Sequence, residues 1–169
     1  MKTGPAALVV GGDGPLGQAV AARLAAVARV VLGTVDPARS GPALAEIERV
    51  RALYGRDETP ALTVAPDVPA LVRSARRLLP DGHGVVLVEP APDLDLARVV
   101  QATAPGTVLV VVTRARIDPA PLADVLTDGR TLHIVGVEAA APWGGRSTAA
   151  EVGAARTVRD LLVPSDSAA

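Results

Sequence analysis

Cysteine is absent from this 169-residue chain, and aromatic residues are nearly so, with no phenylalanine, one tryptophan and one tyrosine. The lack of cysteine excludes disulfide bonds and thiolate metal sites. Only two histidines are present, so a metal site would depend on carboxylates, and no such cluster stands out. The chain is 49% hydrophobic, so its core must consist of valine, leucine and alanine, which suits a parallel sheet covered by alanine-rich helices.

Strong net charge and long apolar runs are also lacking. The formal net charge is −1, so the sequence shows no positive surface for nucleic acid or an anionic membrane. The longest apolar runs have the length of a strand and fall short of a bilayer span. No basic segment followed by an apolar one opens the chain as a secretory signal would. We therefore expect neither nucleic acid nor membrane as a partner, and a cytoplasmic location.

Short apolar runs alternate with helical patterns along the chain, which is typical of βαβ units. This alternation predicts one α/β domain over residues 1–163, followed by a flexible tail at 164–169. We expect a doubly wound, Rossmann-like parallel sheet of about six strands with helices on both faces. The expected strands are 6–10, 29–35, 61–64, 84–89, 107–113 and 131–137. The expected helices are 15–27, 42–54, 68–79, 93–104, 119–127 and 148–162.

Several helix starts carry their own sequence signals. Pro42 suits the first turn of the second helix, and Asp67, Asp93 and Asp118 are expected to cap the three helices that follow. Ligands of a doubly wound sheet bind beyond the carboxyl ends of its strands. The turns after the strands are therefore the places to search for functional residues.

The turn after the first strand is rich in glycine and leads directly into a helix. Counted from Gly12, its glycines satisfy G-x-G-x-x-G, the dinucleotide-binding fingerprint. Counted from Gly11 they fit G-x-x-G-x-x-G, so the role of each glycine is open by one position. The start of the following helix favours an anion such as a pyrophosphate. The expected cofactor-binding residues of this loop are Gly11, Gly12, Gly14, Pro15, Leu16 and Gly17.

The end of the second strand bears on the choice of cofactor. Asp36 follows Gly17 by 19 positions, where an acidic residue binds the ribose hydroxyls of NAD. Arg39 could instead meet the 2′-phosphate of NADP, and Asp36 could be no more than a turn residue before Pro37. The cofactor is thus NAD or NADP, with NAD slightly favoured.

Three segments resemble the nucleotide-binding domain of prephenate or arogenate dehydrogenase, the family that oxidatively decarboxylates a cyclohexadienol in tyrosine biosynthesis. They are Val9–Gly17, Val85–Leu96 and Pro105–Val137. The resemblance extends over nearly all of this chain but over only the first half of a typical family member, which also has a helical domain that completes the substrate site and the dimer. It implies an NAD(P)-dependent oxidoreductase for a carboxylated cyclic substrate, with a second copy or a partner protein completing the site.

The chain departs from this family where the chemistry should lie. The family's Ser-Val-Lys turn reads Arg114-Ala115-Arg116, and its His-Pro-Met, whose histidine accepts the substrate's hydroxyl proton, reads Glu138-Ala139-Ala140. We expect Arg114 and Arg116 to bind a substrate carboxylate, and Glu138 to act as the base if burial raises its pKa. The plainer alternatives are a solvated turn for the arginines and a helix cap or ion pair for Glu138. These departures favour a specialised pathway over tyrosine biosynthesis.

The sequence also draws attention to four further residues, and it leaves two other functions open. Trp143 could cover a ligand ring, anchor a partner or simply pack in its loop, and Glu89 could face the crevice or form a turn. His133 and Tyr54 are expected to be structural. The last helix, 148–162, could support a homodimer. The fold could also host an isomerase, lyase or cyclase without hydride transfer, or act as a binding or regulatory module without catalysis.

Overall fold

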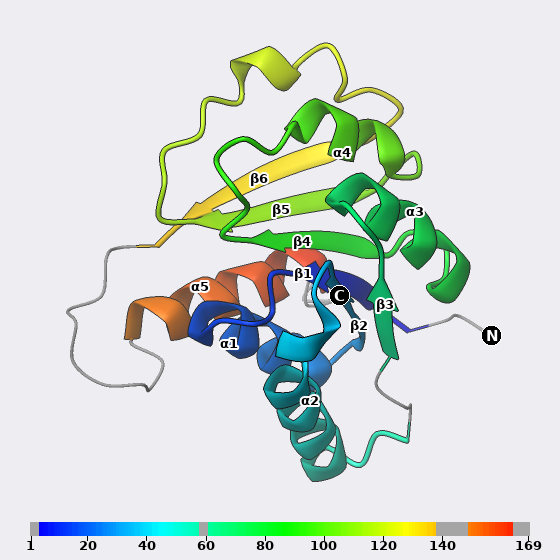
Figure 1. Cartoon of the computed structure of the whole chain (residues 1–169), viewed down its shortest axis with the longest axis vertical. Helices are drawn as coiled ribbons and strands as arrows, with labels where there is room; N and C mark the ends of the chain where they lie inside the picture. The colour runs from blue at the N-terminus through cyan, green and yellow to red at the C-terminus, as the bar shows by residue number, and fades with distance from the viewer. Residues whose placement is uncertain (1–3, 58–60, 138–148, 164–169) are drawn as a thin grey trace, which may run out of the picture.

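The computed structural model describes residues 4–57, 61–137 and 149–163. Within these residues, six strands form one all-parallel sheet in the order β3-β2-β1-β4-β5-β6 (Figure 1). This is the doubly wound α/β fold that the alternating sequence pattern predicts. The elements are β1 (Ala6–Val10), α1 (Pro15–Ala25), β2 (Arg29–Thr34), η1 (Pro37–Arg39), α2 (Gly41–Leu53), β3 (Ala61–Val64), α3 (Val68–Leu78), β4 (Gly84–Val88), α4 (Leu96–Ala102), β5 (Val108–Thr113), η2 (Ala120–Leu122), β6 (Thr131–Gly136) and α5 (Ala149–Leu162).

Helices cover both faces of the sheet, with α1, α2 and α5 on one side and α3 and α4 on the other (Figure 1). Side chains alternate between the faces along each strand. On β1, Ala7 and Val9 belong to the core cluster with α1, α2 and α5, whereas Leu8 belongs to the cluster with α3 and α4. Both faces of the central strands are therefore buried, and a ligand has access to the sheet at the strand ends.

The helix starts confirm the expected cap at Asp67 and correct the one at Asp93. Asp67 caps α3, since its Oδ1 accepts a hydrogen bond from the amide of Ala70 at 2.7 Å. Asp93, in contrast, does not cap α4: Asp95 does, accepting from the amide of Arg98 at 3.3 Å. The residues around Asp93 form a separate turn, in which the amide of Leu94 donates to the carbonyl of Ala91. The fourth helix is consequently shorter than its predicted 93–104.

The helix predicted at 119–127 is wrong. The segment forms only the short η2 turn and then irregular turns. Pro119 and Pro121 cannot donate backbone hydrogen bonds, and a proline also disfavours helical geometry at the residue before it. Asp118 accepts a hydrogen bond from the amide of Ala120 at 3.0 Å, but it is not the expected cap: the N-cap of the single 3-10 turn that follows is Pro119.

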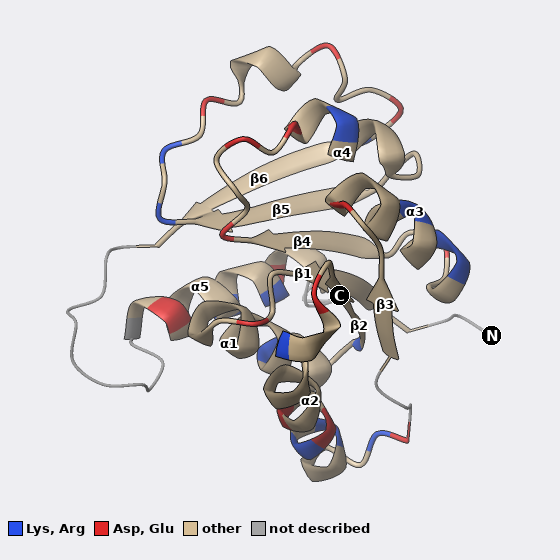
Figure 2. Cartoon of the chain, in the orientation of Figure 1, with Lys and Arg blue, Asp and Glu red and all other residues tan. Residues whose placement is uncertain are grey.

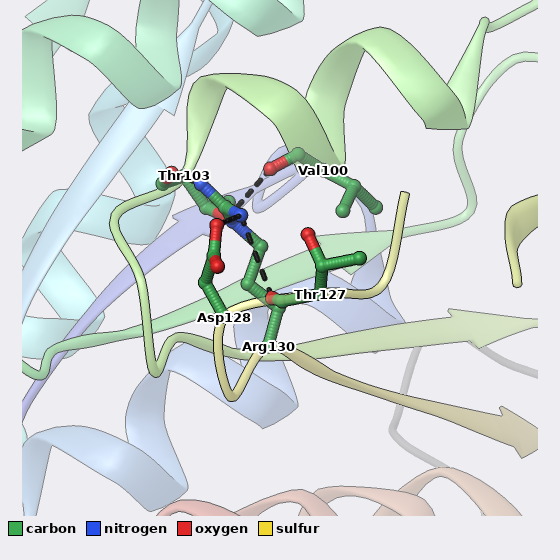
Figure 3. A network of polar contacts seen from close by, with 5 residues as sticks. All are labelled: Val100, Thr103, Thr127, Asp128 and Arg130. Carbon is green, nitrogen blue, oxygen red and sulfur yellow. Dashed lines mark hydrogen bonds and ion pairs between the residues drawn. The ribbon is translucent and has the colours of Figure 1, made fainter. Parts of the chain in front are cut away.

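A polar network holds the end of α4 against the start of β6 (Figure 3). The guanidinium of Arg130 donates to the hydroxyl of Thr103 at 3.2 Å and to its carbonyl at 3.0 Å. The same group is 3.2 Å from Asp128, and the Thr103 hydroxyl donates to the carbonyl of Val100 at 2.6 Å. The network adds side-chain donors to two carbonyls at the helix end, those of Val100 and Thr103. It lies at the amino ends of the strands, away from the edge where ligands bind, and we regard it as structural.

Candidate functional site

The candidate site lies where the strand order reverses, at the carboxyl end of β1, which has β2 on one side and β4 on the other. In doubly wound sheets the ligand binds in the crevice at this switch point. The first residues after β1, β2, β4 and β5 are Gly11, Val35, Glu89 and Arg114. The carboxyl edge of the sheet thus carries both the glycine loop and Arg114, one of the two predicted arginines.

The glycines of the loop have distinct steric roles. Gly11 has φ +90°, and a Cβ there would lie 2.2 Å from the carbonyl oxygen of Val88. A Cβ on Gly17 would lie 2.1 Å from the carbonyl oxygen of Gly11, whereas at Gly14 no heavy atom lies within 4 Å. Gly11 therefore makes the tight turn, Gly17 allows close packing of helix on turn, and Gly14 leaves open space in front of the backbone. The geometry supports the glycine spacing counted from Gly11.

The helix that follows the loop begins without a side-chain cap. Gly14 is the N-cap, Pro15 occupies the first turn, and that turn contains no acidic residue. Leu16 is buried and anchors the helix. Gly12 faces the side chain of Leu32, and a Cβ added at Gly12 would lie 3.1 Å from it. The amides of the first turn have no side-chain acceptor, so this eleven-residue helix offers a backbone anion site.

Two hollows adjoin each other along the loop between β4 and α4. The first has a volume of about 220 Å³ and lies over the ends of β1, β2 and β4, with Asp13 and Glu89 as its charged lining residues. The second, of about 290 Å³, lies between the loops after β4 and β5 and includes Arg116. Both are lined by Pro90 and Ala91. The half of the crevice beside the glycine loop is therefore lined by two carboxylates, and the half between the loops after β4 and β5 is lined by the cation Arg116.

Asp36 caps the η1 turn, so the turn-forming alternative is seen in the structure. Its Oδ1 accepts from the amide of Ala38 at 3.1 Å, and its Oδ2 lies 3.5 Å from Nε of Arg39. The amide of Asp36 also donates at 3.0 Å to the hydroxyl of Thr34, a residue that lines the first hollow. The ion pair is exposed and hence weak. Both side chains can therefore turn toward a ligand.

Arg114 contacts two carboxylates of the chain itself. Its guanidinium donates to Glu89 and, at 2.8 Å, to Oε1 of Glu151 in the first turn of α5. The hydrogen bond that Arg114 donates to Glu89 and the charges of both carboxylates raise the pKa of Arg114 above its ordinary value. Glu151 is buried, while Glu89 has a φ of +45° and donates its amide to the carbonyl of Val112. Sequence reasoning missed Glu151 because it lies 37 positions from Arg114.

Arg116 differs from Arg114 in its surroundings. It is exposed, and among the described residues no carboxylate is paired with it. It lines the second hollow together with Thr113 and the apolar side chain of Ile117. Of the two arginines expected to bind a substrate carboxylate, Arg116 is the one whose guanidinium is available.

The other predicted residues lie elsewhere. Glu138 and Trp143 fall outside the described residues. His133 lies in the amino-terminal half of β6, and the other histidine, His83, for which no role was predicted, is buried at the amino end of β4 with Nδ1 2.9 Å from the carbonyl oxygen of Pro80. Tyr54 is exposed at the end of α2. In the described part of the chain no three His, Asp or Glu residues gather to hold a metal, and no helix is long and apolar enough to span a membrane.

Comparison with known proteins gives structural matches only. No family model matches the chain, and no curated protein matches its sequence. A short-chain dehydrogenase from Oenococcus oeni aligns with a TM-score of 0.67 and 11% identity, over 95% of this chain and 91% of that one. Hydroxysteroid dehydrogenase from Escherichia coli aligns with a TM-score of 0.64 and 15% identity, over 94% and 89% of the two chains.

A metagenomic short-chain oxidoreductase, solved in complex with NADP, also aligns, with a TM-score of 0.62 and 16% identity over 98% of this chain and 94% of that one. At such identities these likenesses establish the fold. The chain has the Rossmann-type fold of these short-chain dehydrogenases. None of the three is a prephenate dehydrogenase, so the resemblance to that family gains no further support from them.

Proposed function

We propose that the chain binds NAD or NADP at its glycine loop and acts as an oxidoreductase. The observation that carries this proposal is the uncapped start of α1 behind Gly14, held by two glycines whose positions admit no side chain. The residues present fit a dinucleotide: the loop would hold the pyrophosphate and Asp36 the ribose hydroxyls, or Arg39 a 2′-phosphate. When bound, the nicotinamide supplies the hydride acceptor or donor. The NADP complex of a protein with the same fold adds support.

For the substrate we propose a carboxylated cyclic compound in the second hollow. Arg116 would bind the carboxylate through two parallel hydrogen bonds, against the apolar wall that Leu94 and Ile117 provide. Arg114 would have an indirect role, because it would fix the positions of the two carboxylates that it contacts, Glu89 and Glu151. Glu138, at the expected end of the sixth strand, would accept the proton of the substrate hydroxyl.

A second function, nucleotide binding without hydride transfer, has one observation in its favour. Proton transfer in enzymes uses histidine, carboxylates, lysine, tyrosine or cysteine. In the described part of the crevice only carboxylates are present, and Glu89 and Glu151 are tied to Arg114. This favours a binding module without catalysis, because an isomerase, lyase or cyclase in this crevice would also need a group that transfers protons, a role left to Asp13 among these carboxylates.

Calorimetric titration of the protein with NAD, NADH, NADP and NADPH tests the cofactor. We expect a millimolar or tighter dissociation constant for at least one of them, with NAD(H) slightly preferred. The absence of binding to all four would exclude the cofactor proposal. Binding of a cofactor with no oxidation of any cyclic hydroxy acid in a panel would favour the second function.

The Glu138→Gln variant tests the base. Its turnover should be lost while its affinity for the cofactor is retained, since an amide cannot accept the proton. Unchanged turnover would remove Glu138 from the mechanism.

We also propose that the chain forms a homodimer through α5, where Val152 is exposed. Light scattering should give twice the mass of one chain, and a monomeric mass would contradict the dimer.

A further inference from the structure

A second basic site lies outside the crevice, in a hollow of about 240 Å³ on the helix layer formed by α3 and α4. Its polar lining consists of Arg73, Arg76, Arg98 and Gln101. Figure 2 shows basic residues on both of these neighbouring helices. None of the four side chains takes part in the crevice.

The helical spacing explains why these side chains meet. Arg73 and Arg76 are three positions apart on α3, and Arg98 and Gln101 are three positions apart on α4, so each pair occupies one face of its helix. The opposite faces of α3 and α4 are buried in the core. The donors of the two helices therefore converge on one hollow at the surface.

The three arginines have no charge partner within the described residues, since none forms an ion pair there. The acidic residue closest in sequence to Arg98 is Asp95, and its Oδ1 accepts the backbone amide of Arg98 as the cap of α4. The arginine at the crevice, Arg114, is paired with two carboxylates instead. Three cations around one hollow repel each other, and a bound anion would remove this cost.

The helix dipole does not explain the cluster. A cation is favourable in the last turn of a helix, which accounts for Arg76 and its neighbour Arg77 on α3. Arg98, however, is the third residue of α4, near the helix end where the dipole disfavours a positive charge. Its place in the hollow therefore has no explanation in the stability of its own helix.

We propose that this hollow binds the phosphate or diphosphate group of a small molecule, independently of the function proposed for the crevice. A carboxylate has two oxygens, which one arginine satisfies, whereas a phosphate presents more oxygens and more charge to several guanidinium groups at once. The volume suits such a group with the rest of its molecule outside. Nucleic acid fits less well, because it requires a broad basic surface and this chain has a formal net charge of −1.

Calorimetric titration with inorganic diphosphate tests the site in the full chain. The Arg76→Gln/Arg98→Gln variant should bind diphosphate about tenfold more weakly or worse than the unmodified protein, since it loses two charge-assisted contacts. Arg77→Gln is the matched control: it removes an exposed charge one position along α3 that does not line the hollow, and its affinity should stay within about twofold. Arg98→Lys should fall between the two, because lysine keeps the charge but loses the bidentate geometry.

Three results would overturn the proposal. The first is no binding of diphosphate by the unmodified protein. The second is unchanged affinity in the double variant, which would place diphosphate at the glycine loop instead. The third is an equal loss in Arg77→Gln, which would indicate general charge attraction. A melting temperature of the double variant no lower than that of the unmodified protein, without diphosphate, would support the repulsion among the arginines.

Discussion

The two halves of the crevice use their polar groups in opposite ways. Beside β1 and β2, the backbone amides at the start of α1 are uncapped, and Asp36 and Arg39 form only a weak, exposed pair. Beside β4 and β5, Arg114 is held by Glu89 and the buried Glu151. The comparison indicates that the first half keeps backbone amides that can bind an anion, while the second half holds Arg114 in contacts within the chain and leaves Arg116 exposed in its hollow.

The largest expected effect concerns the backbone of the first half. Gly17→Ala should lower the free energy of unfolding by about 3 kcal/mol, because its Cβ would overlap the carbonyl of Gly11. Gly14→Ala, in open space, should change it by less than about 0.5 kcal/mol. Equilibrium unfolding in urea measures both. Equal stabilities of the two variants would contradict the different roles assigned to these glycines.

The second effect tests the internal pairing of the other half. Arg114→Met should lower the free energy of unfolding by about 2 kcal/mol, because it removes the cation beside the buried carboxylate of Glu151. This is less than the usual cost of breaking a buried pair, because the Arg114 side chain is 30% exposed and solvent screens its charge. Arg116→Met is the control, with an expected change below about 0.5 kcal/mol. Thermal or urea unfolding measures both variants. Equal losses of unfolding free energy would show that the contacts of Arg114 stabilise the fold no more than Arg116 does.

The third effect is on cofactor choice at the end of β2. Asp36→Asn should weaken NADH binding about tenfold and leave NADPH less affected, while Arg39→Gln should weaken NADPH binding about tenfold. Calorimetric titration of each variant with each cofactor gives four affinities, each compared with that of the unmodified protein. A parallel loss of both cofactors in either variant would indicate a structural role for that residue and not a selective one.

The smallest effect is a pH dependence away from the crevice. On α2, two hydrogen bonds from Arg49, at 2.9 and 2.7 Å, lower the pKa of Glu46 below its ordinary value of 4.5. The carboxyl binds its proton less readily when folded, so the pair stabilises the fold above pH 4.5 and this contribution is lost as the pH falls through the lowered pKa. Glu46→Gln should therefore lose less stability on acidification. A steeper loss than in the unmodified protein would contradict this sign.

The pairing of Arg114 behaves differently with pH. Its pKa is raised above the strongly basic value that is ordinary for arginine, so its contribution is fully present below that value and is lost only at still higher pH. The guanidinium consequently stays charged over the whole range in which the protein would be studied. Any pH dependence at the crevice must come from other groups.

Sequence alone predicts the first half of the crevice better than the second. The strand, the glycine turn and the start of α1 are contiguous, and the steric demands at Gly11 and Gly17 act over a few residues. The contact between Arg114 and Glu151 joins the turn after β5 to α5 across 37 positions, and no local pattern marks it. The helix predicted at 119–127 failed for a local reason, because two prolines interrupt an otherwise helical pattern.

The most direct test of the central claim is a titration of Gly14→Asp with NADH and NADPH. An aspartate at this N-cap can accept the free amides of the first turn, so the variant should be at least as stable as the unmodified protein. Its carboxylate would occupy the place proposed for the pyrophosphate, and we expect binding of both cofactors to weaken at least about tenfold. Gly153→Ala, in open space on α5, should bind them normally. Unchanged cofactor affinity in a folded Gly14→Asp protein would contradict the claim that the glycine loop binds the nucleotide.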